Sequence, residues 1–141
     1  MKMNCYFCKK NCMLTAFKKY IDSKGIKIQS EDETTIFFER NGLQYTFVCE
    51  KTDPYYFRVI LPNILKVNNE NEQEILRLVN STNLKFKVAK SVIIEDKNVW
   101  ISVELFVYSM NNIDELFDRI FILCEVVLNE YKEYLNSKKT K

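Results

Sequence analysis

An Asn-Gly pair at positions 41 and 42 constrains the fold more than any other feature of the chain. Such a pair favours a two-residue turn, and this kind of turn joins neighbouring antiparallel strands. The stretch 34–39 before it is β-branched and aromatic, and the stretch 43–50 after it alternates between two faces. One face of the second stretch carries Leu43, Tyr45, Phe47 and Cys49. The sequence therefore predicts an antiparallel sheet with an apolar face, and it places Phe47 inward.

Helical patterns precede and follow this hairpin. Apolar residues recur at helical spacing over 11–24, and Gly25 stands where a left-handed residue ends a helix. The spacing of Asn71 and Glu74 resembles a capping box and predicts a short second helix. A third helix is expected over 112–136. Its middle is apolar nearly all round, which indicates neighbours on two sides.

Further strands are expected between these helices. A strand over 55–61 ends, bends or runs along an edge at Pro62, because proline cannot donate to a strand ladder. The stretch 64–67 resumes pairing in this interpretation. Two more strands are expected over 84–95 and 99–108, joined by a polar turn.

This order of elements indicates an α+β fold, a single antiparallel sheet with helices packed on it, in the order α-β-β-β(-β)-α-β-β-α. No linker divides the sequence, so we expect one domain over 13–136. It is preceded by an N-terminal segment, 1–12, that we expect to fray. It is followed by a basic tail, 137–141, that contains Lys138, Lys139 and Lys141.

Three local strings and the element order carry a resemblance to a known family. The strings are Tyr-Phe-Arg-Val-Ile-Leu-Pro-Asn at 56–63, Val79-Asn80, and Lys85-Phe86-Lys87. Together with the long terminal helix, they resemble the YbjN-like family, which is similar in fold to the small chaperones of type III secretion. The resemblance covers roughly 13–135. It implies an α+β domain that often dimerises and has a protein-interaction or regulatory role, with no catalytic residues to assign.

Composition argues against several classes of function. The chain has no histidine and two glycines, so it lacks imidazole catalysis and a glycine-rich phosphate loop. We therefore expect no enzyme activity and no cofactor. The isoelectric point of about 8.2 and the excess of lysine over arginine do not suggest a nucleic-acid-binding surface. The acidic run Glu31-Asp32-Glu33 is most simply a solvated turn, although paired carboxylates can also bind cations.

The cysteines offer the one metal-like spacing. Cys5 and Cys8 have the spacing of a zinc knuckle, and Cys12 could complete a cluster. A fourth ligand would have to be Cys49, Cys124, a carboxylate or a group from a second chain. We expect no metal, because such spacing is common and the three cysteines also fit the spacing of the first helix.

No segment reads as a membrane span or as a signal peptide. The stretch 1–11 has no continuous apolar region, and the longest near-apolar run, 120–128, contains Glu125 and is too short for a bilayer. We expect a cytoplasmic protein with no membrane partner and with reduced cysteines.

Two apolar groups are left over once the core is assigned, one on a strand face and one on the last helix. They are Trp100, Phe106 and Tyr108, and Ile122, Leu123 and Val126. A stacking platform for nucleic acid is disfavoured on the strand face because Glu104 lies on it and repels phosphate. We therefore expect an interaction surface, a homodimer, and a further protein partner.

The sequence thus predicts a non-catalytic protein-interaction module that serves as a regulator, adaptor or chaperone of another protein. The alternative is a small-ligand binding domain with a pocket between the sheet and the helices.

Overall fold

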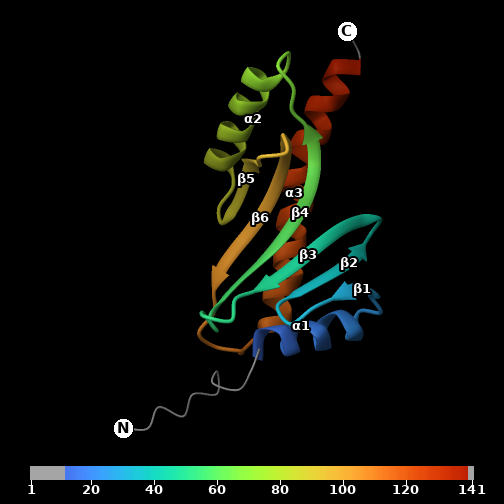
Figure 1. Cartoon of the computed structure of the whole chain (residues 1–141), viewed down its shortest axis with the longest axis vertical. Coiled ribbons are helices and arrows are strands. Elements are labelled where there is room, and N and C mark those ends of the chain that lie inside the picture. The colour runs from blue at the N-terminus through green and yellow to red at the C-terminus, as the bar shows by residue number, and fades with distance from the viewer. Residues whose placement is uncertain (1–11, 140–141) are drawn as a thin grey trace.

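The computed structural model describes residues 12–139 and confirms the α+β fold (Figure 1). Six antiparallel strands form one sheet in the order β1-β2-β3-β4-β6-β5. The elements are α1 (Cys12–Ser23), β1 (Ile28–Glu31), β2 (Thr35–Arg40), β3 (Leu43–Cys49), β4 (Tyr56–Lys66), α2 (Glu72–Lys85), β5 (Ala89–Ile93), β6 (Asn98–Phe106) and α3 (Ile113–Lys139). Among the described residues, no helix has the length and apolar character that crossing a membrane requires.

Both glycines stand where the sequence required a left-handed backbone. Asn41 and Gly42 have φ of 53° and 75° and form the turn between β2 and β3. Gly25, with φ of 70°, ends α1. The Gly25 N–H donates to the Asp22 carbonyl and the Ile26 N–H donates to the Ile21 carbonyl, which is a Schellman motif.

Strand β4 passes through Pro62 instead of ending there. Its pairing with β6 shifts register between Leu61 and Leu65, and Asn63 in this bulge has φ of 56°. The stretch 64–67 therefore continues β4 through Lys66 and is not a separate strand. The fourth strand before α2 is instead β1, which the sequence analysis did not find.

The boundary between α2 and β5 differs from the prediction. The expected strand over 84–95 was wrong at its start, because α2 continues to Lys85 and β5 begins at Ala89. The Phe86 N–H still donates to the Thr82 carbonyl. At the other end, Asn71 is the N-cap but makes no side-chain cap bond; its Oδ1 accepts from the Asn68 N–H.

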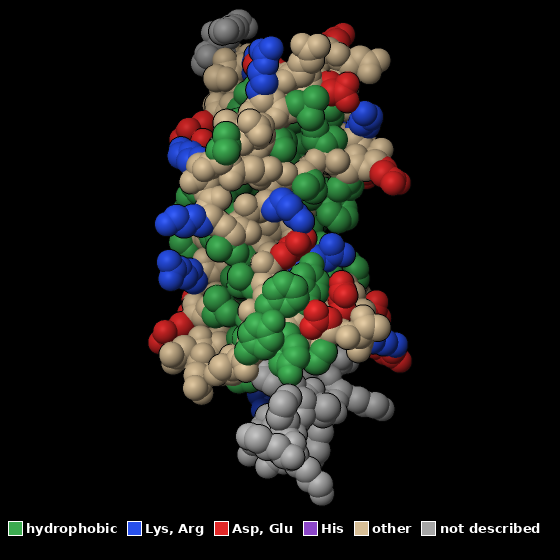
Figure 2. All heavy atoms as spheres, turned by 90° about the vertical axis from the view of Figure 1, so that its left-hand side faces the viewer, with side chains coloured by type: hydrophobic (Ala, Val, Ile, Leu, Met, Phe, Trp, Pro, Cys, Tyr) green, Lys and Arg blue, Asp and Glu red, His purple; other side chains and the backbone are tan. Residues whose placement is uncertain are grey.

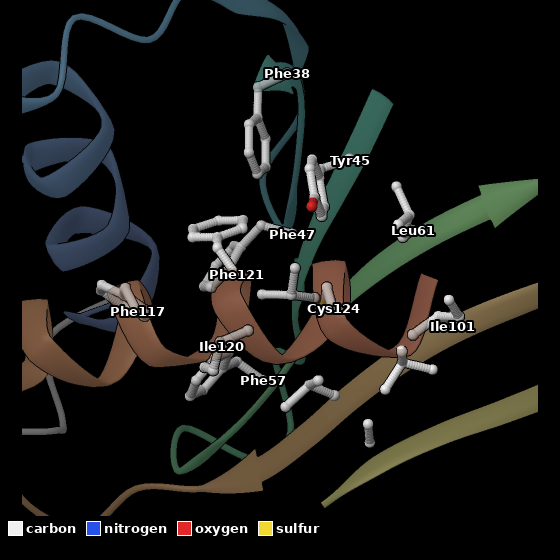
Figure 3. Close-up of a cluster of buried hydrophobic side chains, with 14 of the residues drawn as sticks. Phe38, Tyr45, Phe47, Phe57, Leu61, Ile101, Phe117, Ile120, Phe121 and Cys124 are labelled. Carbon is white, nitrogen blue, oxygen red and sulfur yellow. The ribbon is translucent and has the colours of Figure 1, made fainter. Parts of the chain in front are cut away.

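All three helices pack on one face of the sheet. The Phe17 ring of α1 stacks on Phe47 of β3 with 4.0 Å between centroids, and the ring centroid of Phe117 of α3 lies 5.1 Å from that of Phe17. Figure 3 shows Phe47 and Phe117 in this buried cluster. Thr82 of α2 hydrogen-bonds Tyr131 of α3 at 3.1 Å, on the same side. Phe47 is fully buried, as predicted. Rings fill the space between α1, α3 and the sheet, so this region does not favour a ligand pocket.

Candidate interaction surface

The second face of the sheet carries no helix in residues 12–139, since α1, α2 and α3 all lie on the other side. Strand alternation decides which side chains reach it. Arg58 and Glu104 are directly paired across β4 and β6, as are Tyr56 and Phe106. We call this the outer face; on β4 and β6 it carries Tyr56, Arg58, Ile60, Trp100, Ser102, Glu104 and Phe106.

Four aromatic side chains gather where β4 begins and β6 ends; we call them the aromatic end. Tyr56 and Phe106 have centroids 5.7 Å apart, and Tyr55 and Tyr108 lie 4.8 Å apart. Phe106 is 61% exposed and Tyr108 is 70% exposed. Figure 2 shows the left-hand side of Figure 1, and hydrophobic side chains gather in its lower half beside acidic ones. Exposed aromatic clusters of this kind are typical of protein interfaces.

Trp100 lies on the same face but is held in place. Its Nε1–H donates to Asn63 Oδ1 at 3.3 Å, so the β4 bulge fixes the indole orientation. The ring is half-buried, and Val92 of β5 is its cross-strand partner. Trp100 is thus a rigid part of the outer face, while Phe106 and Tyr108 project from its end.

Charged groups occupy the middle of the outer face. Lys90 Nζ lies 2.9 Å from Glu104 Oε1, and the Ser102 hydroxyl donates to the same oxygen at 3.3 Å. Burial alone would raise the pKa of Glu104, but Lys90, Ser102 and Arg58 lower it on balance. Arg58 forms no ion pair with any described residue, and its Nε is buried without an acceptor. The face therefore holds a guanidinium whose hydrogen bonding is incomplete.

The other predicted group lies on the opposite side of the molecule. Ile122 is 58% exposed and Val126 is 42% exposed. Helical geometry turns both almost directly away from the α3 residues that are buried against the sheet, such as Cys124. Leu123 is half-buried and packs against the core. We call Ile122, Leu123 and Val126 the α3 ridge. A single two-fold contact can bury the outer face or the ridge, but not both.

Sequence reasoning missed an exposed apolar group around α2. Leu76 is 51% exposed, Leu84 81% and Val88 56%. Leu84 lies in the stretch that was expected to be a strand, and Leu76 directly follows the buried Ile75. Ile75 is the only apolar residue of α2 that is fully buried. The helical wheel alone could have separated Ile75 from Leu76.

The β5 edge of the sheet is closed by a side chain. Asn83 Oδ1 accepts from the Ser91 N–H at 2.7 Å, and Asn83 Nδ2 donates to the Ser91 carbonyl at 3.0 Å. The amide thus replaces one peptide unit of a neighbouring strand, which is a way to block edge pairing. Addition of a further strand at Ser91 is therefore prevented, so the open face is the better surface for association.

The remaining candidate sites are the N-terminal cysteines and the acidic run 31–33. Cys5 and Cys8 lie outside the described residues, so the cluster stays untested there. Within residues 12–139, no group of three potential metal ligands occurs. Asp32 Oδ1 accepts from the Thr34 and Thr35 N–H groups, and Glu31 pairs with Lys18 at 2.6 Å. These carboxylates form a turn and an ion pair.

Comparison with solved structures places this arrangement among known folds. The chain is similar to the E. coli protein YbjN, a proposed transcription regulator, with a TM-score of 0.67 at 11% identity over 86% of this chain and 93% of that one. The chain has a YbjN-like, chaperone-like fold. It is equally similar to a chain of the HopA1–SchA chaperone–effector complex, with a TM-score of 0.65 and 11% identity over 86% and 93% of the two chains.

A further similar structure is that of an uncharacterised protein from Methanothermobacter thermautotrophicus. Its TM-score is 0.58 at 14% identity, over 85% of this chain and 96% of that one. No family model and no curated protein sequence matches the chain. The resemblance read from the sequence is therefore confirmed at the level of the fold, and neither named neighbour is described as an enzyme.

Proposed function

We propose that the chain is a non-catalytic protein-interaction module that forms a homodimer and acts as a regulator, adaptor or chaperone of another protein. The observation that carries this proposal is the outer face, because it exposes the aromatic end on the one side of the sheet that no described helix covers. The descriptions of two proteins with this fold, a chaperone–effector complex and a proposed regulator, support it.

The two exposed groups suit two different partners. The outer face carries aromatic rings and charges of both signs, so it can be complementary to a second copy of itself. The α3 ridge is apolar and lies on the opposite side, so it stays accessible in a dimer formed by the outer faces. In this proposal the second copy covers the outer face and another protein binds the ridge.

Replacing Phe106 by Glu is expected to convert the dimer to a monomer. In the dimer the introduced carboxylate would be buried against aromatic rings with no cation to pair with, and this strongly opposes association. Position 106 is exposed in the single chain, so the substitution leaves folding unaffected. Light scattering at micromolar concentration should return twice 16.9 kDa for the natural chain and 16.9 kDa for the variant.

Leu84→Glu is the matched control, since Leu84 is even more exposed and lies on α2. It should remain a dimer. A monomer from Leu84→Glu together with a dimer from Phe106→Glu would move the interface to α2. A monomer mass for the natural chain at every concentration would remove the dimer from the proposal.

Replacing Ile122 by Glu is expected to weaken binding of the partner protein while leaving the dimer intact. The partner is first captured from the native host with the natural chain, then purified and titrated against each variant by calorimetry. We expect affinity to fall at least about tenfold, the effect of losing an interface residue worth more than about 1 kcal/mol.

Leu135→Glu, an exposed position near the end of the same helix, is the control and should bind normally. Equal affinity of the two variants would contradict the role of the ridge.

A further inference from the structure

The strongest unexplained feature of the outer face is Arg58. The residue is half-buried, and its Nε is buried without an acceptor. It makes no ion pair with a described residue, although Glu104 lies directly across from it. Glu104 is already held by Lys90 and Ser102. A carboxylate supplied to the face by another molecule would give this cation a partner.

One carboxylate on the same face has neither an ion pair nor a side-chain hydrogen bond among the described residues. Glu50 directly follows β3, where the alternation that turns Cys49 inward turns Glu50 outward. Glu50 is exposed. Burial raises the pKa of the Tyr56 hydroxyl, the charges of Glu104 and Glu50 raise it further, and the charge of Arg58 opposes the rise. Arg58 and Glu50 are therefore neighbours around Tyr56, and their charges are opposite.

The other carboxylates of the outer face are occupied. Glu104 is bound to Lys90, and Glu39 accepts a hydrogen bond from the Gln44 amide at 2.9 Å. Register places Val48 opposite Arg58 and Cys49 opposite Phe57, so Glu50 lies diagonally across from Arg58 on adjacent strands. A two-fold axis can lie parallel to the sheet, above the midpoint of this pair and perpendicular to the line that joins the two residues. Rotation about such an axis would carry Arg58 of one copy over Glu50 of the other.

We infer that the occupant of the outer face is a second copy of this chain, held in register by two reciprocal Arg58–Glu50 ion pairs around a centre formed by Tyr56 and Phe106. The inference rests on the proposed function and specifies its dimer. A two-fold contact needs a self-complementary surface, and this face offers an unpaired cation, an unpaired anion and aromatic rings. Arginine and tyrosine are also the residues that most often dominate the energy of an interface.

Charge inversion tests the pairing. Arg58→Glu and Glu50→Arg should each raise the dimer dissociation constant by about 100-fold or more, because each places like charges together twice in the dimer. The double variant in one chain should dimerise again. Arg77→Glu on α2, an exposed arginine, is the matched control and should dimerise normally. Circular dichroism establishes that every variant is folded.

A mixture of the two single variants gives the decisive result. Neither should form a homodimer, but an equimolar mixture should form a 1:1 heterodimer, which native mass spectrometry resolves by mass. In the mixed dimer the carboxylate introduced at position 58 of one variant meets the guanidinium introduced at position 50 of the other. At the second contact the unchanged Glu50 of the first variant meets the unchanged Arg58 of the second. An ion pair within one chain cannot produce this recovery.

Each other outcome is informative about a different claim. If Phe106→Glu gives a monomer but the charge variants remain dimers, or if the mixture stays monomeric, the Arg58–Glu50 pairing is overturned while the proposed dimer stands. If the natural chain is a monomer, the dimer of the proposed function and the pairing are both overturned.

Discussion

Replacing Phe47 by Ala is expected to lower the free energy of unfolding by about 3–5 kcal/mol, through lost transfer energy and the cavity left behind. Phe47 is fully buried and stacks on Phe17 at 4.0 Å. Its ring centroid is 5.5 Å from that of Phe57, and both side chains are labelled in Figure 3. These contacts join α1, β3 and β4, so no single element can move to fill the gap. Guanidinium denaturation followed by circular dichroism measures the change.

Phe37→Ala is the matched control for this prediction. Phe37 lies on the neighbouring strand β2, and it is 42% exposed because it points to the outer face. We expect a loss below about 1 kcal/mol there. Both variants are compared at one protein concentration, since association adds to apparent stability. A small loss at Phe47 with a large loss at Phe37 would mean that the inward and outward faces are reversed.

The hairpin and the faces of its strands could be predicted because they depend on local rules. Asn41-Gly42 supplied the two left-handed residues that the turn needs, and alternation after it marked Phe47 as inward. Gly25 ended α1 for the same local reason. Where the backbone conformation of one or two residues decides an element, the sequence is sufficient.

Elements that depend on tertiary contacts were predicted less well. All four residues of β1 are exposed, so Ile28–Glu31 has no apolar alternation to reveal a strand. At the end of α2, Leu84 is apolar and fits either a helix or a strand. In the last turns of this helix the Thr82 hydroxyl forms a hydrogen bond with Tyr131, a contact that lies far away in sequence. The bulge at Asn63 likewise follows from pairing with β6.

The candidate surface was predicted in part. Alternation placed Trp100 and Phe106 on one strand face, but it could not show that the α3 ridge lies on the opposite side of the molecule. That relation depends on which face of the sheet α3 covers. Arg58 was missed because its isolation depends on the register of β4 with β3 and β6. Its position between Phe57 and Val59, both buried, was the available signal.

The second large effect concerns the buried cysteines, whose thiols should be almost unreactive in the folded protein. Cys49 and Cys124 are buried free thiols, and burial raises the pKa of each from 9.0 to about 12. The thiolate is the species that reacts with alkylating agents. The raised pKa lowers the fraction of each cysteine that is thiolate at pH 8 by about 1,000-fold.

Intact-mass kinetics with iodoacetamide test this in a Cys5→Ser, Cys8→Ser, Cys12→Ser variant, which leaves only the two buried thiols. The same variant in concentrated guanidinium is the control and should react at the rate of an ordinary thiol. Cys124 lies on the inward side of α3 and Cys49 at the end of β3, so opening of the sheet edge alone exposes neither. Reaction of the folded chain within tenfold of the denatured rate would show that α3 separates readily from the sheet. The core around Phe47 would then be far less stable than its packing indicates.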